Sequence, residues 1–162
     1  ADSFDRAVAL ATDMFAHRVP RRYDLVIAEM LPPLDRNLYQ LQKAVENCQA
    51  AVAEGGALVV VSACEEGVGS PHFYGLAERW DPVENRPVDG VLSFGSHKLS
   101  RIVAITRRIR VLVFSGLFPD EVRRVFYEPL DNAQDFLYSR RNACEKCNLA
   151  VVRDAGHTVL IN

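Results

Sequence analysis

The sequence predicts an α/β domain of three layers, in which a mostly parallel, Rossmann-like sheet lies between helices on both faces. Short apolar runs rich in Val, such as ALVVVSAC at 57–64, alternate along the chain with longer segments of helical periodicity. The runs are apolar at consecutive positions, which is typical of parallel strands buried on both sides. Strands that alternate with helices in this way favour a parallel sheet with both faces covered.

Length and composition are those of one compact domain, predicted to span residues 1–162. Of the 162 residues 49% are hydrophobic, which is enough for one core but not for two independent ones. The 19 Lys and Arg residues against 21 Asp and Glu give a net charge of −2, so no positive excess attracts nucleic acid or an anionic membrane. The basic clusters RVPRR and TRRIR are expected to be solvated surface.

The sequence also bounds where the protein works. No run approaches the ~20 apolar residues of a membrane span, and no signal-peptide pattern opens the sequence. The 4 cysteines are few and irregularly placed, which suits reduced thiols. We therefore expect a cytoplasmic protein. The first residue is Ala and lies directly in a helical pattern, so we also expect a piece cut from a longer polypeptide.

The first half of the chain contains two predicted helices and two predicted strands. Apolar residues three and four positions apart predict a helix at 3–18. The run YDLVIAEM at 23–30 predicts a buried strand. A second helix is expected at 35–52, because its apolar residues form one stripe, and the Glu-Gly-Gly turn that follows is expected to end it. The strand at 57–64 comes next.

The second half continues the alternation of helices and strands. Pro129 is expected to divide one long helical segment into two pieces or to kink it. The predicted elements are a glycine loop and short helix at 65–80, a polar excursion at 81–91, a helix at 96–108, a strand at 109–117, the divided helix at 119–141, and two last strands at 148–156 and 157–162.

The second helix carries three polar side chains in its first two turns: Tyr39, Gln40 and Lys43. In a doubly wound sheet, ligands bind outside the carboxyl ends of the strands, where the following helices begin. The spacings of three and four allow the three side chains to converge on one side of the helix, beside free backbone N–H groups at its N-terminus. Together they suit a small carboxylate. The alternative is an ordinary solvated helix face, and spacing alone does not decide between the two.

A resemblance to a known family favours the first interpretation. The segments YDLVIAEM, DRNLYQLQKAVENCQAAVAEGGALVVVSACEEGVG and FGSHKLSRIVA, in this order, resemble the C-terminal domain of the nickel-dependent lactate racemase family. Its hallmark here is a Tyr-Gln-x-x-Lys helix followed by a Gly-Gly turn, a buried strand and an E-G-x-G loop. The resemblance runs from about Tyr23 to the final strand and is strongest at 37–69.

The resemblance implies an isomerase built from two domains. Such enzymes interconvert the stereoisomers of a 2-hydroxy acid by moving its C2 hydride to and from a nickel-pincer nucleotide, which an N-terminal domain holds. By this resemblance Lys43 and Gln40 are catalytic residues that hold the substrate carboxylate and oxygen, and Tyr39 lies beside the site. The expected partners are the N-terminal domain of the same parent protein and a small 2-hydroxy acid. This chain alone is expected to be inactive.

The chain departs from the family where EMLPPLD replaces a turn of small residues. Glu29 and Met30 stand where small side chains would let a ligand approach. This departure puts the identity of the substrate in doubt.

Two further segments supply candidate site residues. Gly67 and Gly69, between a strand and a helix, are expected to contribute cofactor-binding backbone at the rim of the site. His72 stands where the third glycine of a dinucleotide fingerprint would fall, so that fingerprint is incomplete. His97, in the segment GSHK, resembles the family's glycine-histidine segment and is a candidate for substrate binding.

Two alternatives to the enzyme remain open. The first is a non-catalytic module that binds a small organic acid through the same three side chains. The second is a nucleotide-binding module that uses Gly67 and Gly69. Metal binding is not expected: Cys144 and Cys147 have the spacing of a zinc or redox pair, but no second pair follows and His157 alone does not complete a site.

Overall fold

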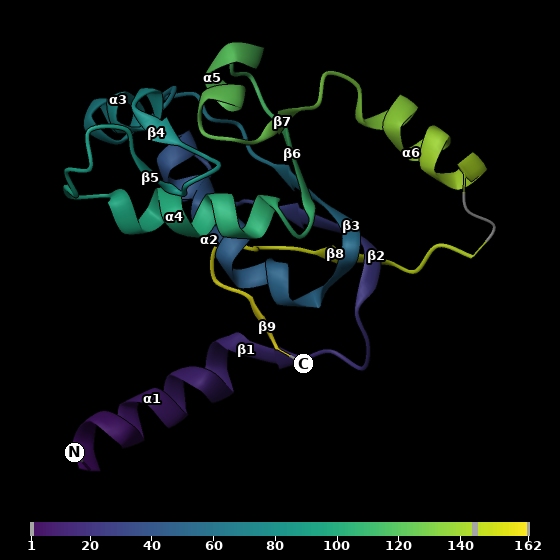
Figure 1. Cartoon of the computed structure of the whole chain (residues 1–162). Coiled ribbons are helices and arrows are strands. Elements are labelled where there is room, and N and C mark those ends of the chain that lie inside the picture. The colour runs from purple at the N-terminus through teal and green to yellow at the C-terminus, as the bar shows by residue number, and fades with distance from the viewer. Residues whose placement is uncertain (1, 144–145, 162) are drawn as a thin grey trace.

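The computed structural model describes residues 2–143 and 146–161, and its centre is a five-stranded parallel sheet. The strand order is β7-β6-β3-β2-β8 (Figure 1). The strands are β2 (Tyr23–Glu29), β3 (Val52–Val61), β6 (Arg110–Phe114), β7 (Glu128–Pro129) and β8 (Leu149–Val152). The predicted α/β class with a parallel sheet is confirmed. Because β3, β6 and β7 extend the sheet on one side of β2 and β8 lies on the other, the direction of winding changes between β2 and β8.

The main core lies on one face of the sheet, beneath three helices. These are α2 (Leu38–Cys48), α3 (Pro71–Glu78) and α4 (Ser96–Thr106). Alternate residues of β2 and β3, such as Val26 and Val60, pack with Leu41 of α2 and Leu99 of α4, and all four are fully buried. The apolar stripe that predicted α2 from the sequence is the stripe that contacts the sheet.

The opposite face of the sheet carries a smaller hydrophobic core. The intervening strand residues Leu25, Val59 and Leu112 form a small second core, against which Leu130 and Phe136 pack. Phe136 belongs to α6 (Ala133–Ala143), whose first turns line a small cavity with Ile27 of β2 and Val59 of β3 on this face. The helical segment expected at 119–141 is divided as predicted, into α5 (Pro119–Arg124) and α6, and Pro129 lies in the edge strand β7 between them.

The ends of the described chain form a separate two-stranded sheet. Helix α1 (Asp2–Phe15) projects from the body of the molecule and continues into β1 (Ala16–Arg18), which pairs in parallel with β9 (Val159–Ile161) (Figure 1). The fifth strand expected at the end of the chain is therefore present, but it pairs with β1 and not with the main sheet. The excursion after α3 contains a short hairpin of β4 (Trp80–Asp81) and β5 (Arg86–Pro87).

The boundaries of the second helix differ from the prediction. It begins at Leu38 because Asn37 is the N-cap, whose side-chain oxygen accepts a hydrogen bond from the Gln40 N–H at 3.1 Å. It ends at Cys48, and a 3₁₀ turn, η1 (Gln49–Ala51), leads into β3 at Val52. The Glu-Gly-Gly sequence predicted as a turn therefore lies inside a strand.

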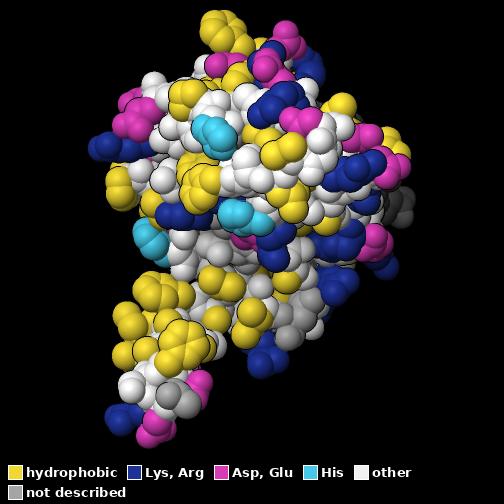
Figure 2. Space-filling model, turned by 60° about the vertical axis from the view of Figure 1, so that its left-hand side comes forward, with side chains coloured by type: hydrophobic (Ala, Val, Ile, Leu, Met, Phe, Trp, Pro, Cys, Tyr) yellow, Lys and Arg dark blue, Asp and Glu magenta, His cyan; other side chains and the backbone are white. Residues whose placement is uncertain are grey.

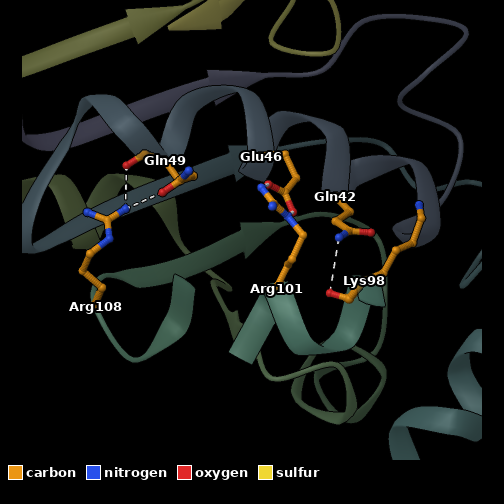
Figure 3. Close-up of polar contacts among 6 residues, drawn as sticks. All are labelled: Gln42, Glu46, Gln49, Lys98, Arg101 and Arg108. Carbon is orange, nitrogen blue, oxygen red and sulfur yellow. Dashed lines mark hydrogen bonds and ion pairs between the residues drawn. The ribbon is translucent and has the colours of Figure 1, made fainter. Parts of the chain in front are cut away.

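A side chain distant in the sequence caps the end of this helix. The local sequence pattern gives no sign of it. The Arg108 guanidinium donates to the carbonyl and the side-chain oxygen of Gln49, at 2.8 and 2.6 Å (Figure 3). It also donates to the carbonyl of Val52 at 3.3 Å. It thereby satisfies carbonyl groups that have no partner within the helix.

The thiols fit the expectation of reduced cysteines where they are described. Cys48 and Cys64 are buried and form no disulfide. Burial raises the pKa of the Cys48 thiol to about 12, and burial also raises the pKa of Cys64. Both therefore remain protonated at neutral pH. Cys144 of the Cys144/Cys147 pair lies outside the described residues. Among the described residues, no helix has the length and apolar character that crossing a membrane requires.

The fold predicts unequal effects of two leucine truncations. Leu41→Ala, in the fully buried stripe of α2, is expected to lower the free energy of unfolding by about 2–5 kcal/mol because it leaves a cavity. Leu10→Ala, on the exposed surface of α1, is the matched control and is expected to change it by less than about 0.5 kcal/mol. Urea denaturation followed by circular dichroism measures both values. Equal losses would contradict this account of the core.

Candidate functional site

An open groove of about 300 Å³ separates the outer sides of α2 and α4. Its walls are the second and third turns of α2 and the first two turns of α4, seen in part in Figure 3. The lining residues are Gln42, Lys43, Glu46, Asn47, His97, Lys98 and Arg101. Because three cations and one carboxylate line it, the groove has a positive balance of charge and suits a small anion.

Lys43 and His97 are the predicted site residues that line the groove together. Both side chains are exposed, and within the described part of the chain no hydrogen bond or ion pair to the Lys43 ammonium is present. The ammonium is therefore available to a ligand. Gln40 and Tyr39 do not line the groove, although all three residues of the predicted trio emerge within an arc of about 100° of the helix surface.

Tyr39 packs between the helices, partly buried. Its ring meets the Phe73 ring of α3 edge to face, with centroids 5.4 Å apart. The Lys98 ammonium of α4 lies 3.8 Å from the Tyr39 ring centroid, a cation–π contact. The cation beside Tyr39 is therefore Lys98, from the opposite wall of the groove, and not Lys43, four residues along the same helix. This contact holds a second ammonium at the groove.

Side chains also join the two walls of the groove. The guanidinium of Arg101 in α4 forms two hydrogen bonds to the Glu46 carboxylate of α2, one of them 2.7 Å long. These bonds raise the pKa of Arg101. Gln42 is buried and donates from its side-chain nitrogen to the Lys98 carbonyl at 3.4 Å (Figure 3). The polar pairs fix the spacing of the helices, and Lys43 projects beside them.

The start of α2 differs from the sequence-based expectation of free backbone N–H groups. The Leu38 N–H donates to the Gly67 carbonyl at 3.1 Å, and the Tyr39 N–H donates to the Val68 carbonyl at 3.3 Å. The Gln40 N–H donates to the Asn37 side chain. The first N–H groups of the helix are thus satisfied by the chain itself, and the expectation of free groups is wrong.

Gly67 and Gly69 have a structural task in the same arrangement. Gly67 presents its carbonyl to α2, while its N–H donates to the Cys64 carbonyl at 2.9 Å. Gly69 has a φ of +75°, and a Cβ there would lie 2.3 Å from the Asn37 side chain. The Glu66 carboxylate accepts hydrogen bonds from Asn37 and Arg36. The loop at 65–69 therefore positions the cap of α2, and the Gly67 N–H is not available to a phosphate.

Glu29 and Met30, at the end of β2, make contacts within the protein. Glu29 forms an ion pair with Arg153 at 3.5 Å, and its carbonyl accepts a hydrogen bond from the Ala155 N–H. Met30 is buried in the core. The two residues that depart from the family pattern thus take part in contacts within the protein, and the open groove lies along α2.

Sequence reasoning did not include Lys98, Arg101 and Glu46 among the site residues. A signal exists for two of them: Lys98 and Arg101 are three positions apart in the helix that begins with His97, so they share its groove-facing side. Glu46 lies three positions after Lys43 on α2. What the sequence lacks is the information that α2 and α4 are neighbours.

The fold and the groove define a class of protein: a Rossmann-like α/β domain with a positively charged groove between two helices on one face of its sheet. Residues 21–93 match the family model described as the lactate racemase C-terminal domain. The match covers the part of the chain in which the sequence resemblance is strongest, and it confirms that resemblance. The matched segment contains Tyr39, Gln40, Lys43, Gly67 and Gly69, and it ends before His97.

Two solved structures share the fold. The lactate racemase apoprotein from Thermoanaerobacterium thermosaccharolyticum superimposes with a TM-score of 0.79 at 20% identity, over 95% of this chain and 39% of that one. A Thermotoga maritima protein gives 0.68 at 11% identity, over 99% of this chain and 42% of that one. The chain thus spans about two fifths of the length of each. No curated protein matches the sequence.

The capping loop predicts opposite effects of two glycine substitutions. Gly69→Ala is expected to lower the free energy of unfolding by about 2 kcal/mol, because it forces a left-handed alanine and displaces the Asn37 cap. Gly75→Ala, in α3 with open space around it, is the control and is expected to raise stability by about 0.5–1 kcal/mol. Thermal or urea denaturation tests both. A neutral Gly69→Ala would refute the assigned role of the loop.

Proposed function

We propose that this chain is the substrate-orienting C-terminal domain of a 2-hydroxyacid racemase or epimerase of the lactate racemase type. The observation that carries the proposal is the unpartnered Lys43 ammonium among the described residues, on the wall of a cationic groove and within the segment matched to the family. In this proposal, residues 1–162 form one domain of a larger cytoplasmic isomerase and are inactive alone.

The proposed chemistry of Lys43 is electrostatic. An ammonium is a compact positive charge with three donors, which suits the carboxylate of a 2-hydroxy acid or the oxygen that gains charge as the C2 hydride departs. Lys98 supports this role by adding a second positive charge, held over the Tyr39 ring. Because no carboxylate of the described residues pairs with Lys43, binding an anion there breaks no existing ion pair.

Gln40 and His97 are proposed to orient the substrate. Gln40 is one helical turn before Lys43, and its amide provides both a donor and an acceptor for a hydroxyl group. His97 lies across the groove, where an imidazole reaches a ligand held by Lys43. Tyr39 supports the site through its contacts with Phe73 and Lys98 rather than through a free hydroxyl.

The described residues of this chain do not fit a nickel-pincer nucleotide. Among the residues that the structure describes, no three His, Cys, Asp or Glu side chains come together as metal ligands. The Gly67 N–H, predicted to contact the cofactor, already donates to Cys64. The proposal therefore leaves the cofactor to the N-terminal domain of the parent protein and assigns Gly67 and Gly69 to the cap of α2. For the same reason the nucleotide-binding alternative receives no support.

Removing the proposed anion-binding charge tests this function. In the full-length parent protein, Lys43→Ala is expected to lower kcat/KM for racemisation about 10²–10³-fold, as expected for loss of a group that stabilises a developing charge. Racemisation of a panel of 2-hydroxy acids, followed by chiral chromatography, measures the effect.

The control is Lys146→Ala, which removes an exposed lysine that does not line the groove and is expected to leave turnover unchanged. Near-normal turnover of Lys43→Ala would reject the role of Lys43. A parent protein that binds the acids through Lys43 but racemises none would instead support the organic-acid-binding alternative.

A further inference from the structure

Helix α1 exposes an apolar side that the described part of the chain leaves uncovered. None of its residues is buried, and the large apolar side chains of this side are open to solvent, for example Phe4 at 72% and Val8 at 47%. The spacing of Phe4, Val8, Ala11 and Phe15 places them along one side of the helix. Figure 2 shows these hydrophobic side chains gathered on the projecting helix, at the lower left. A continuous apolar surface of this kind marks a contact with another protein surface.

The apolar side of α1 is also one wall of a recess. The recess has a volume of about 370 Å³ and is lined by Val8, Ala11, Thr12, Phe15, Ala16, Val159 and Ile161. The residues of β9 alternate: Leu160 is buried in the core, while Val159 and Ile161 face the recess. Helix α1 and strand β9 thus form one continuous apolar surface, which includes the recess and the exposed side of the helix.

The two strands beside α1 form an incomplete sheet. Strands β1 and β9 pair in parallel, and among the described residues neither has a second neighbour. A two-stranded sheet is marginally stable on its own, and parallel strands are found in larger sheets with covered faces. Unpaired strand edges also present backbone groups to which another strand can pair. Helix α1 and the β1–β9 pair therefore have an uncovered apolar side and unpaired strand edges, both of which another domain could cover.

The lengths of the structural neighbours indicate what covers α1 and the β1–β9 pair. The superposition on the Thermotoga maritima protein covers 99% of this chain, α1 included, but only 42% of that chain. The lactate racemase apoprotein likewise extends well beyond the 39% that is matched. A polypeptide of this architecture therefore carries enough additional chain for another domain.

We infer that α1 and the β1–β9 pair are the surface on which the other domain of the parent polypeptide docks, burying the apolar side of α1 and the recess. The inference rests on the proposed function only in requiring a second domain. The charged residues Asp2, Asp5, Arg6 and Asp13 lie on the remaining sides of α1 and stay in water. In the assembled protein the apolar side of α1 is thus buried between the two domains. This contact holds the domain that contains the groove at a fixed position relative to the other domain.

Cysteine labelling at two adjacent positions of α1 tests the inference. Val8→Cys lies in the recess, and Ala9→Cys lies on the polar side between Asp5 and Asp13. Each variant is made in this chain alone and in the full-length parent, and maleimide labelling is followed by peptide mass spectrometry, which separates the native cysteines. In the parent, Val8→Cys is expected to react about tenfold more slowly than in this chain alone, while Ala9→Cys reacts equally in both.

Equal labelling of Val8→Cys in the two proteins would overturn the inference. Protection in this chain alone that increases with protein concentration would also overturn it, because a second copy would then be the occupant. Hydrogen exchange of the amides of residues 2–15 in the unmodified proteins gives the same comparison if Val8→Cys prevents folding. Neither readout uses catalysis, so a parent that protects Val8 but racemises nothing fails only the proposed function.

Discussion

The position of the groove depends first on the hydrogen bonds that the backbone N–H groups at the start of α2 form. Three backbone N–H groups of its first turn donate to the Gly67 carbonyl, the Val68 carbonyl and the Asn37 side chain. Buried N–H groups without partners are costly, so the helix and the loop at 65–69 stabilise each other. The loop in turn needs Gly69, because any side chain there would displace Asn37. The direction in which Lys43 leaves the helix follows from this arrangement.

The second wall of the groove depends on contacts between helices. Arg101 and Glu46 form paired hydrogen bonds across it, and Gln42 reaches the backbone of Lys98. An ion pair near the surface, such as that of Arg101 and Glu46, contributes little to overall stability, about 0–1 kcal/mol. The consequence of these contacts is geometric, since they hold α4 beside α2 while the Lys98 ammonium rests on the Tyr39 ring. A rigid groove with two ammonium groups is suited to orienting a small acid.

Much of the fold could be predicted because its signals are local. The apolar runs of β2, β3 and β6 and the stripe of α2 follow from burial, which sequence periodicity records. The short strands β1 and β7 could not, because two or three residues carry no periodic pattern, and the pairing of the predicted strand β9 with β1 could not be foreseen for the same reason. The end of α2 was also missed, because it depends on Arg108, which is 59 positions from Gln49. Short elements and distant partners are the information that a pattern along one chain does not contain.

In the candidate site, too, the features with a local sequence signal could be predicted and those that depend on distant residues could not. The outward direction of Lys43 was predictable from the helical period, and His97 and Lys43 do share a groove. The assignment of Gly67 to ligand binding rested on the flexibility of glycine, which does not tell whether its N–H or its carbonyl points to the neighbouring helix. The role of Lys98 could not be predicted, because it requires the packing of α4 against Tyr39.

The most direct test of the central claim is a titration of the isotope-labelled chain with lactate at constant ionic strength, followed by NMR. The account expects chemical-shift changes in the second turn of α2 and the first turn of α4, and their loss when the positive charge at position 43 is removed. Changes centred instead on Gly67–Gly69, or changes in α2 that persist without the charge, would contradict it.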